Sequence, residues 1–198
     1  MDEARRQSIA ASYIEYIKIA VGVLDSSAPF RDFLDNWYAF SETSAGLLSK
    51  GGRPIWFNNP DVLRLGDQLK RMHYISADAM KIIESAGPDG STYRLRYSSK
   101  DLSIRLMVDH AVPISFLVKM LFDDSAKADS DYIGGFLRRY YRLGVITSDE
   151  NIRITRMGLS NRMPEDWDGC DPFARYRKVG IPAIFPTMSA RVETPQQS

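Results

Sequence analysis

The stretch Val108-Asp109-His110-Ala111-Val112-Pro113-Ile114-Ser115 places an acid and an imidazole side by side at the end of an apolar run. Residues 102–107 alternate between apolar and mostly polar side chains, which is the two-residue period of a half-buried strand. Pro113 predicts a turn directly after this strand. Neighbouring strand residues point to opposite faces, so Asp109 and His110 can flank a common ligand only where the strand ends in such a turn.

A second stretch, Thr147-Ser148-Asp149-Glu150-Asn151-Ile152-Arg153, is typical of a helix start. It follows a short apolar run, and either Thr147 or Ser148 can cap the helix. If Thr147 is the cap, Glu150 occupies the third helical position and completes a capping box.

Taken together, VDHAVPISFL (residues 108–117) and VITSDENIR (residues 145–153) resemble the core of HNH, or ββα-metal, nucleases. The wording is most similar to the HNH domain of RNA-guided CRISPR nucleases. The resemblance implies that Asp109 and Asn151 hold one divalent metal ion, Mg²⁺ or Mn²⁺, and that His110 is the general base. It also implies a cut that leaves a 3′ hydroxyl and a 5′ phosphate.

The residue types suit this chemistry. Phosphodiester hydrolysis needs a deprotonated water and a cation at the phosphate, and an imidazole can accept a proton at physiological pH. A carboxylate and an amide oxygen suit a hard ion, whereas two histidines and one cysteine in the whole sequence exclude a zinc site. Arg153 and Arg156 are three residues apart on one helix face, where an arginine beside the metal can hold a phosphate.

One position departs from the family pattern. The family usually has an asparagine that orients the histidine, and Leu143 stands near that place. Asn161 is a second candidate for the helical ligand, although it follows the helix-ending signal Gly158. Two alternatives therefore stay open. One is a non-catalytic protein that keeps the ββα scaffold and binds nucleic acid or a protein, and the other is a helical regulator unrelated to HNH proteins.

Clusters of arginine predict contact with DNA, or alternatively with RNA. A strand over residues 92–97 and the strand before Asp109 put arginines on one sheet face, and a helix over 131–141 interleaves others with tyrosines. A solvated sheet or helix face is the competing interpretation. The net charge of +1 does not distinguish these two interpretations, because a local basic stripe is sufficient to bind nucleic acid. The candidates are Arg94, Arg96, Arg105, Arg138, Arg139, Arg142 and Arg156.

The chain is expected to have an α+β fold in two parts. Helices predicted over 3–24, 30–48 and 76–83, and after Asp61, form a helical region over 1–88, which would bind DNA, dimerise or contact another protein. The aromatic stripe of the helix over 30–48 is expected to pack in the core, and Ser76 can cap the helix over 76–83. The turn-rich stretch 86–91 separates it from the HNH-like module over 91–182. Residues 183–198 are predicted to form an extended tail.

Composition sets the broad class of protein. Hydrophobic residues at 44% and charged residues at 26% are typical of a soluble globular chain. One cysteine excludes an internal disulfide, which suits a reducing compartment. The sequence has no apolar run long enough for a signal peptide or a membrane span, so we expect a cytoplasmic protein without membrane contact.

Overall fold

A small mixed sheet joins the two halves of the chain in the computed structural model, which describes residues 2–23, 30–41, 72–85, 104–124 and 129–184. Its strand order is β2-β3-β1-β4. β2 runs antiparallel to β3, β1 lies parallel to β3, and β4 closes the other edge antiparallel to β1. The strands are β1 (Tyr74–Ser76), β2 (Leu106–His110), β3 (Leu143–Thr147) and β4 (Ala183–Ile184).

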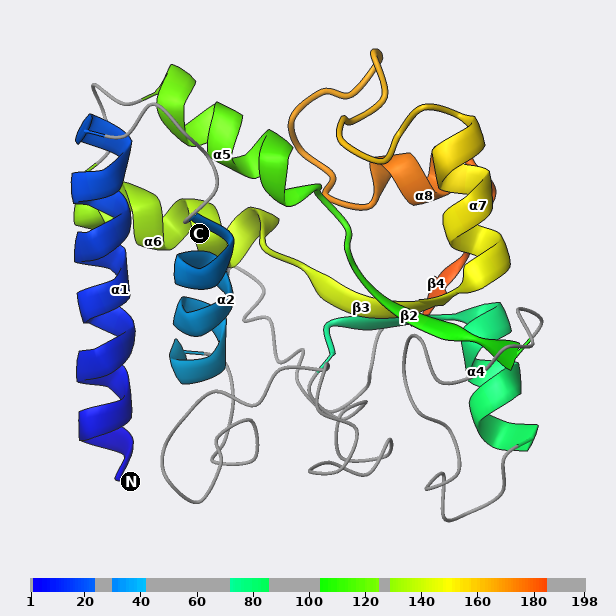
Figure 1. The fold of residues 1–198 in the computed structure, drawn as a ribbon, viewed down its shortest axis with the longest axis horizontal. Helices are drawn as coiled ribbons and strands as arrows, with labels where there is room; N and C mark the ends of the chain where they lie inside the picture. Colours follow the sequence, from blue (N-terminus) through cyan, green and yellow to red (C-terminus); the bar gives the residue numbers. More distant parts are fainter. Residues whose placement is uncertain (1, 24–29, 42–71, 86–103, 125–128, 185–198) are drawn as a thin grey trace, which may run out of the picture.

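Helices lie at both ends of this sheet, so the described part of the chain is a mixed α and β structure compatible with the expected α+β class. On the left of Figure 1 stand α1 (Glu3–Val23), α2 (Phe30–Ser41), α5 (Ile114–Asp123) and α6 (Ser130–Tyr140). On the right, beside the strands, stand α4 (Ala77–Ser85), α7 (Ser148–Arg156) and α8 (Ala174–Lys178). None of the described helices is long and apolar enough to cross a membrane.

The aromatic residues of α2 belong to the core, as their helical spacing predicts. Phe30, Leu34 and Trp37 are buried in one cluster with Leu117 of α5 and Leu137 of α6. Side chains three and four residues apart share a helix face, and this face carries the apolar residues of α2. The same packing also sets the direction of the polar face of α2, and this direction matters for the site described below.

β2 and β3 pair antiparallel although α5 and α6 lie between them in sequence, and α7 follows β3 directly. Thr147 ends β3 and caps α7 at once: its hydroxyl oxygen accepts a hydrogen bond from the Glu150 amide at 3.1 Å. The Glu150 carboxylate accepts one in return from the Thr147 amide at 2.8 Å, so the predicted capping box is confirmed. The register of the two strands places Asp109 opposite Gly144 and His110 opposite Leu143.

β1 was not predicted from the sequence, since its short apolar run resembles the end of the preceding helix. It lies between β3 and β4, so elements on the two sides of the predicted boundary at 86–91 share one sheet. β2 is also shorter than predicted, because Ile104 lies in a helical turn and the strand starts at Leu106. The predicted strand over 92–97, the helix after Asp61 and the tail from 185 onward fall outside the described residues.

Gly144 is required by the close approach of a tyrosine ring across the sheet. A Cβ at this position would overlap the ring carbons of Tyr74, which is fully buried. We expect Gly144→Ala to lower the free energy of unfolding by about 1–3 kcal/mol, as overpacked cores do. Gly135→Ala is the matched control, because a Cβ there meets nothing within 4 Å on an exposed helix position. That variant should gain about 0.5–1 kcal/mol. Equal effects in urea unfolding would contradict the overlap.

Candidate functional site

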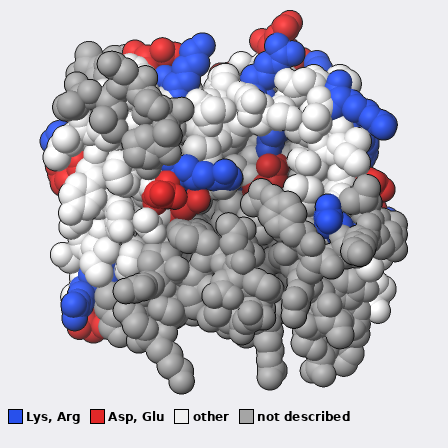
Figure 2. Space-filling view, in the orientation of Figure 1, with Lys and Arg blue, Asp and Glu red and all other residues white. Residues whose placement is uncertain are grey.

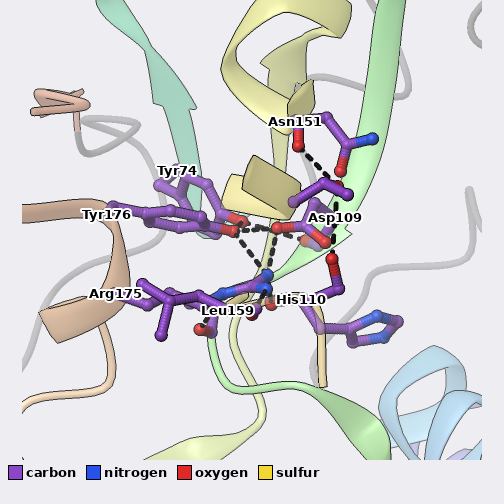
Figure 3. Close-up of polar contacts among 10 residues, drawn as sticks. Tyr74, Asp109, His110, Asn151, Leu159, Arg175 and Tyr176 are labelled. Atoms are coloured by element: carbon purple, nitrogen blue, oxygen red, sulfur yellow. Dashed lines mark hydrogen bonds and ion pairs between the residues drawn. The ribbon is translucent and has the colours of Figure 1, made fainter. Parts of the chain in front are cut away.

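The end of β2 is held by one buried arginine. The Arg175 guanidinium pairs with the Asp109 carboxylate and donates to the His110 carbonyl. It also donates to the carbonyls of Ala111 at 2.9 Å and Leu159 at 3.0 Å. The side chain of Arg175 is only 2% exposed, so these acceptors replace its water. Figure 3 shows the guanidinium reaching from α8 to the strand end.

Two buried tyrosines also donate hydrogen bonds to Asp109 at the end of β2. The Tyr176 hydroxyl donates to the same carboxylate oxygen of Asp109, and the Tyr74 hydroxyl donates to the Asp109 carbonyl at 2.9 Å. The two hydroxyls also contact each other. Burial, followed by the nearby charge of Asp109, raises the pKa of Tyr74 and of Tyr176 well above the ordinary value. Both hydroxyls therefore stay protonated and act as donors.

His110 points to the other side of the strand, as alternation requires. Its Nε2 lies 3.3 Å from the Asp35 carboxylate of α2 and 3.2 Å from the Tyr141 hydroxyl oxygen. Tyr141 donates its own proton to Asp35, and burial raises the pKa of this tyrosine well above its ordinary value. A carboxylate only accepts, so Nε2 of His110 is the donor in the contact with Asp35.

Asp109 and His110 both line a cavity of about 290 Å³ at the turn after β2. Both were predicted to share a site, and the turn at Pro113 brings them to the same cavity although they lie on opposite faces of the strand. The cavity also takes in α2 and the segment that follows α7. Its lining residues are Arg31, Asp109, His110, Pro113, Ile114, Ser115, Ser160, Asn161 and Arg175.

The two predicted metal ligands, Asp109 and Asn151, do not both line this cavity. Asn151 is half-buried in the first turns of α7, its carbonyl accepts from the Thr155 hydroxyl, and it is not among the cavity's lining residues. Asn161, the second candidate, does line the cavity.

The residues do not fit a resident divalent ion held by Asp109 and Asn151. One oxygen of Asp109 is already bound by Arg175 and Tyr176, and a guanidinium on the same carboxylate repels a second cation. Within the described ranges, no group of three or more His, Cys, Asp or Glu gathers to form a cation site.

Arg153 lies at a different place from the one expected. Its guanidinium donates to the carbonyls of Val179 at 3.4 Å and Gly180 at 3.5 Å, and it lies 3.8 Å from the Glu150 carboxylate. These contacts link α7 to the end of α8, and Arg153 is not among the residues that line the cavity. Arg156 is exposed on the last turn of the same helix.

The other predicted nucleic-acid contacts are dispersed. Arg138 and Arg139 are exposed on α6, and the guanidinium of Arg139 lies over the Tyr140 ring. Arg105 and Arg142 are half-buried, whereas Arg94 and Arg96 fall outside the described residues. On the face drawn in Figure 2, the basic side chains of the described residues are interspersed with acidic ones rather than gathered into one basic surface.

Sequence reasoning missed the residues that shape this site. Asp35 lies in a helix whose aromatic pattern indicates only core packing, and Tyr141 looked like part of a basic surface cluster but is 1% exposed. Arg175 belongs to a five-residue helix, which is too short for its periodicity to reveal a buried face. No signal in the sequence pairs these residues with Asp109 or His110.

His73 gives the fold a measurable sensitivity to acid. Burial, with the charge of Arg142 adding to it, lowers the pKa of His73 from 6.5 to about 3, and its Nδ1 accepts from the Leu143 amide at 3.0 Å. Protonation therefore favours the unfolded chain. Stability from this group is complete above about pH 6.5 and is lost toward about pH 3, by up to about 1.4 kcal/mol per pH unit.

We expect His73→Asn, whose amide oxygen can still accept from Leu143, to flatten this dependence. The measurement is urea unfolding of both proteins between about pH 7 and about pH 4. Identical slopes in the two proteins would mean that His73 is not the titrating group.

Comparisons of the chain with protein-family models, with curated proteins and with solved structures found no match.

Proposed function

We propose that the protein is a phosphodiesterase of the HNH type that cleaves nucleic acid, with DNA as the first expected substrate. The observation that carries the proposal is His110 at the end of β2, held through Nε2 by Asp35 and Tyr141, beside a cavity that also contains Arg31. The antiparallel pairing of β2 with β3, with α5 and α6 inserted between them and α7 directly after β3, supports it. An imidazole fixed by a carboxylate on one nitrogen is suited to accept a proton on the other.

In the proposed reaction a water oxygen attacks the phosphorus, and Nδ1 of His110 accepts the water proton. The bond from phosphorus to the 3′ oxygen breaks, and that oxygen takes a proton from solvent, which leaves a 3′ hydroxyl and a 5′ phosphate. A cationic side chain at the phosphate stabilises the charge that develops there. Arg31 is the exposed cation of the cavity, with a side chain 61% exposed.

In this proposal, Mg²⁺ or Mn²⁺ is bound mainly by the phosphate oxygens of the substrate. Such ions are commonly held by phosphate oxygens with one or two carboxylates, and they keep several waters. No step above depends on an ion held by the protein alone.

Plasmid cleavage tests the proposal, with Mg²⁺, with Mn²⁺ and with EDTA. We expect the wild type to nick DNA and His110→Ala to fall to background, while Lys119→Ala, an exposed residue of α5, keeps full activity. Cleavage that survives His110→Ala would refute the role of this histidine. An inactive wild type across plasmid DNA, single-stranded DNA and RNA would refute the proposed activity.

A second function is favoured by one observation. Arg175 neutralises Asp109 in the pair described above, which leaves the cavity better suited to an anion than to a cation. A non-catalytic protein that binds nucleic acid through this cavity is therefore the competing proposal. It predicts DNA binding that weakens with salt, and no cleavage by the wild type with either ion.

A further inference from the structure

We propose that α2 completes the cavity, with Asp35 positioning His110 and Arg31 binding a phosphate oxygen of the DNA backbone. The positioning half rests on the proposed function, whereas the binding half does not require cleavage. Both residues precede the predicted HNH-like module in sequence, so the inference makes the helical region part of the site.

The orientation of α2 supports this placement. Phe30 and Leu34 are fully buried, and they anchor the apolar face of the helix in the core. Arg31 and Asp35 follow each of them by one residue and lie four residues apart, so they share the adjacent face. That face meets the end of β2, because Asp35 contacts His110 and Arg31 lines the same cavity.

Asp35 divides its two oxygens between the partners. One oxygen receives the Tyr141 hydroxyl and faces Nε2 of His110. The other lies 3.9 Å from the Arg31 guanidinium, which is too long for a hydrogen bond. Among the described residues Arg31 is thus held by charge alone, and its side chain is exposed. The guanidinium can turn toward a ligand without breaking a hydrogen bond of this pair.

The chemistry favours a phosphate as the ligand of Arg31. A planar guanidinium binds the oxygens of a phosphate through paired hydrogen bonds. The cavity is also lined by Ser115, Ser160 and Asn161, whose hydroxyl and amide groups are neutral and can donate to the same anion. The cavity is about 290 Å³, which is enough for a phosphodiester group and too small for a folded protein element.

The first test is binding of a short fluorescein-labelled DNA duplex in EDTA, which separates binding from cleavage. We expect Arg31→Gln to weaken binding roughly ten- to hundredfold, and to reduce the slope of log K against log salt by about one contact. Lys119→Gln, on an exposed face outside the cavity, is the control. Equal affinity and equal slope in Arg31→Gln and Lys119→Gln would overturn the role of Arg31.

The second test reads the His110 tautomer by nitrogen NMR, with His73→Asn used to assign the two rings. We expect the wild type to carry its proton on Nε2 and Asp35→Asn to lose that preference. In an active enzyme, Asp35→Asn should lower kcat at least tenfold while DNA affinity stays within about twofold of the wild type. An unchanged tautomer in Asp35→Asn would overturn the positioning role, whether or not the protein cleaves DNA.

Discussion

Replacing Arg175 with methionine is expected to lower the free energy of unfolding by about 3–5 kcal/mol. The substitution keeps the length of the side chain but removes its charge and all its donors. Asp109 then loses its ion-pair partner, and the carbonyls of Ala111 and Leu159 lose a hydrogen bond inside the protein. Each of these losses adds the cost of a buried polar group without a partner. The end of β2, and with it the cavity, should loosen first.

Arg177→Met is the matched control in the same helix. Arg177 pairs with Asp171, but its side chain is 65% exposed, so its loss should cost at most about 1 kcal/mol. The double variant Arg175→Met with Asp109→Asn should lose less than the sum of the single variants, because the unpaired charge is removed. Urea unfolding measures the wild type, the three single variants Arg175→Met, Arg177→Met and Asp109→Asn, and the double variant. A loss for Arg175→Met as small as the loss for Arg177→Met would show that the buried pair does not stabilise the fold.

Glu150→Ala is expected to lower the free energy of unfolding by about 2–4 kcal/mol. The Glu150 side chain is completely buried, and one of its oxygens accepts from both the Thr147 amide and the Ser76 hydroxyl, at 2.8 Å and 2.6 Å. Ser76 in turn caps α4 by accepting from the Ala79 amide at 3.1 Å. Alanine therefore leaves two buried donors unsatisfied and uncouples the starts of α4 and α7.

Glu150→Gln separates hydrogen bonding from charge. Glutamine also completes a capping box, so this variant should keep most of the stability and lose less than about 1 kcal/mol. Asp149→Ala, at the exposed neighbouring position, removes only a favourable charge near the helix start and should cost a similarly small amount. If all three variants unfold at the same urea concentration, the buried hydrogen bonds of Glu150 contribute nothing.

The predictions that succeeded concern local features. The helix predicted over 3–24, which the structure describes as Glu3–Val23, the cap at Ser76, the capping box of α7 and the buried face of α2 all follow from spacings of three or four residues. The strand that ends at Asp109 and His110 follows from a period of two, although its start was predicted four residues too early. Each of these depends on hydrogen bonds or packing between near neighbours in sequence.

The arrangement of the predicted site residues depends on partners that are distant in sequence. Asp109 and His110 line one cavity, but the contacts that hold them come from Arg175 and from Asp35, which are 66 and 75 residues away in sequence. Periodicity carries no information about which distant side chains will meet. The expectation that Asn151 faces Asp109 came from the wording of a motif, and the described contacts do not join the two residues.

The caps of α4 and α7 illustrate which features the sequence determines by itself and which it does not. It determined that Ser76 and Thr147 begin helices, because a side-chain oxygen of the right length satisfies an amide of the first turn whatever the rest of the chain does. Only the tertiary structure decided that β1 lies beside β3, which brings the Ser76 hydroxyl to the Glu150 carboxylate. A short strand is selected by the burial it gains between two neighbours, and those neighbours exist only after the chain has folded.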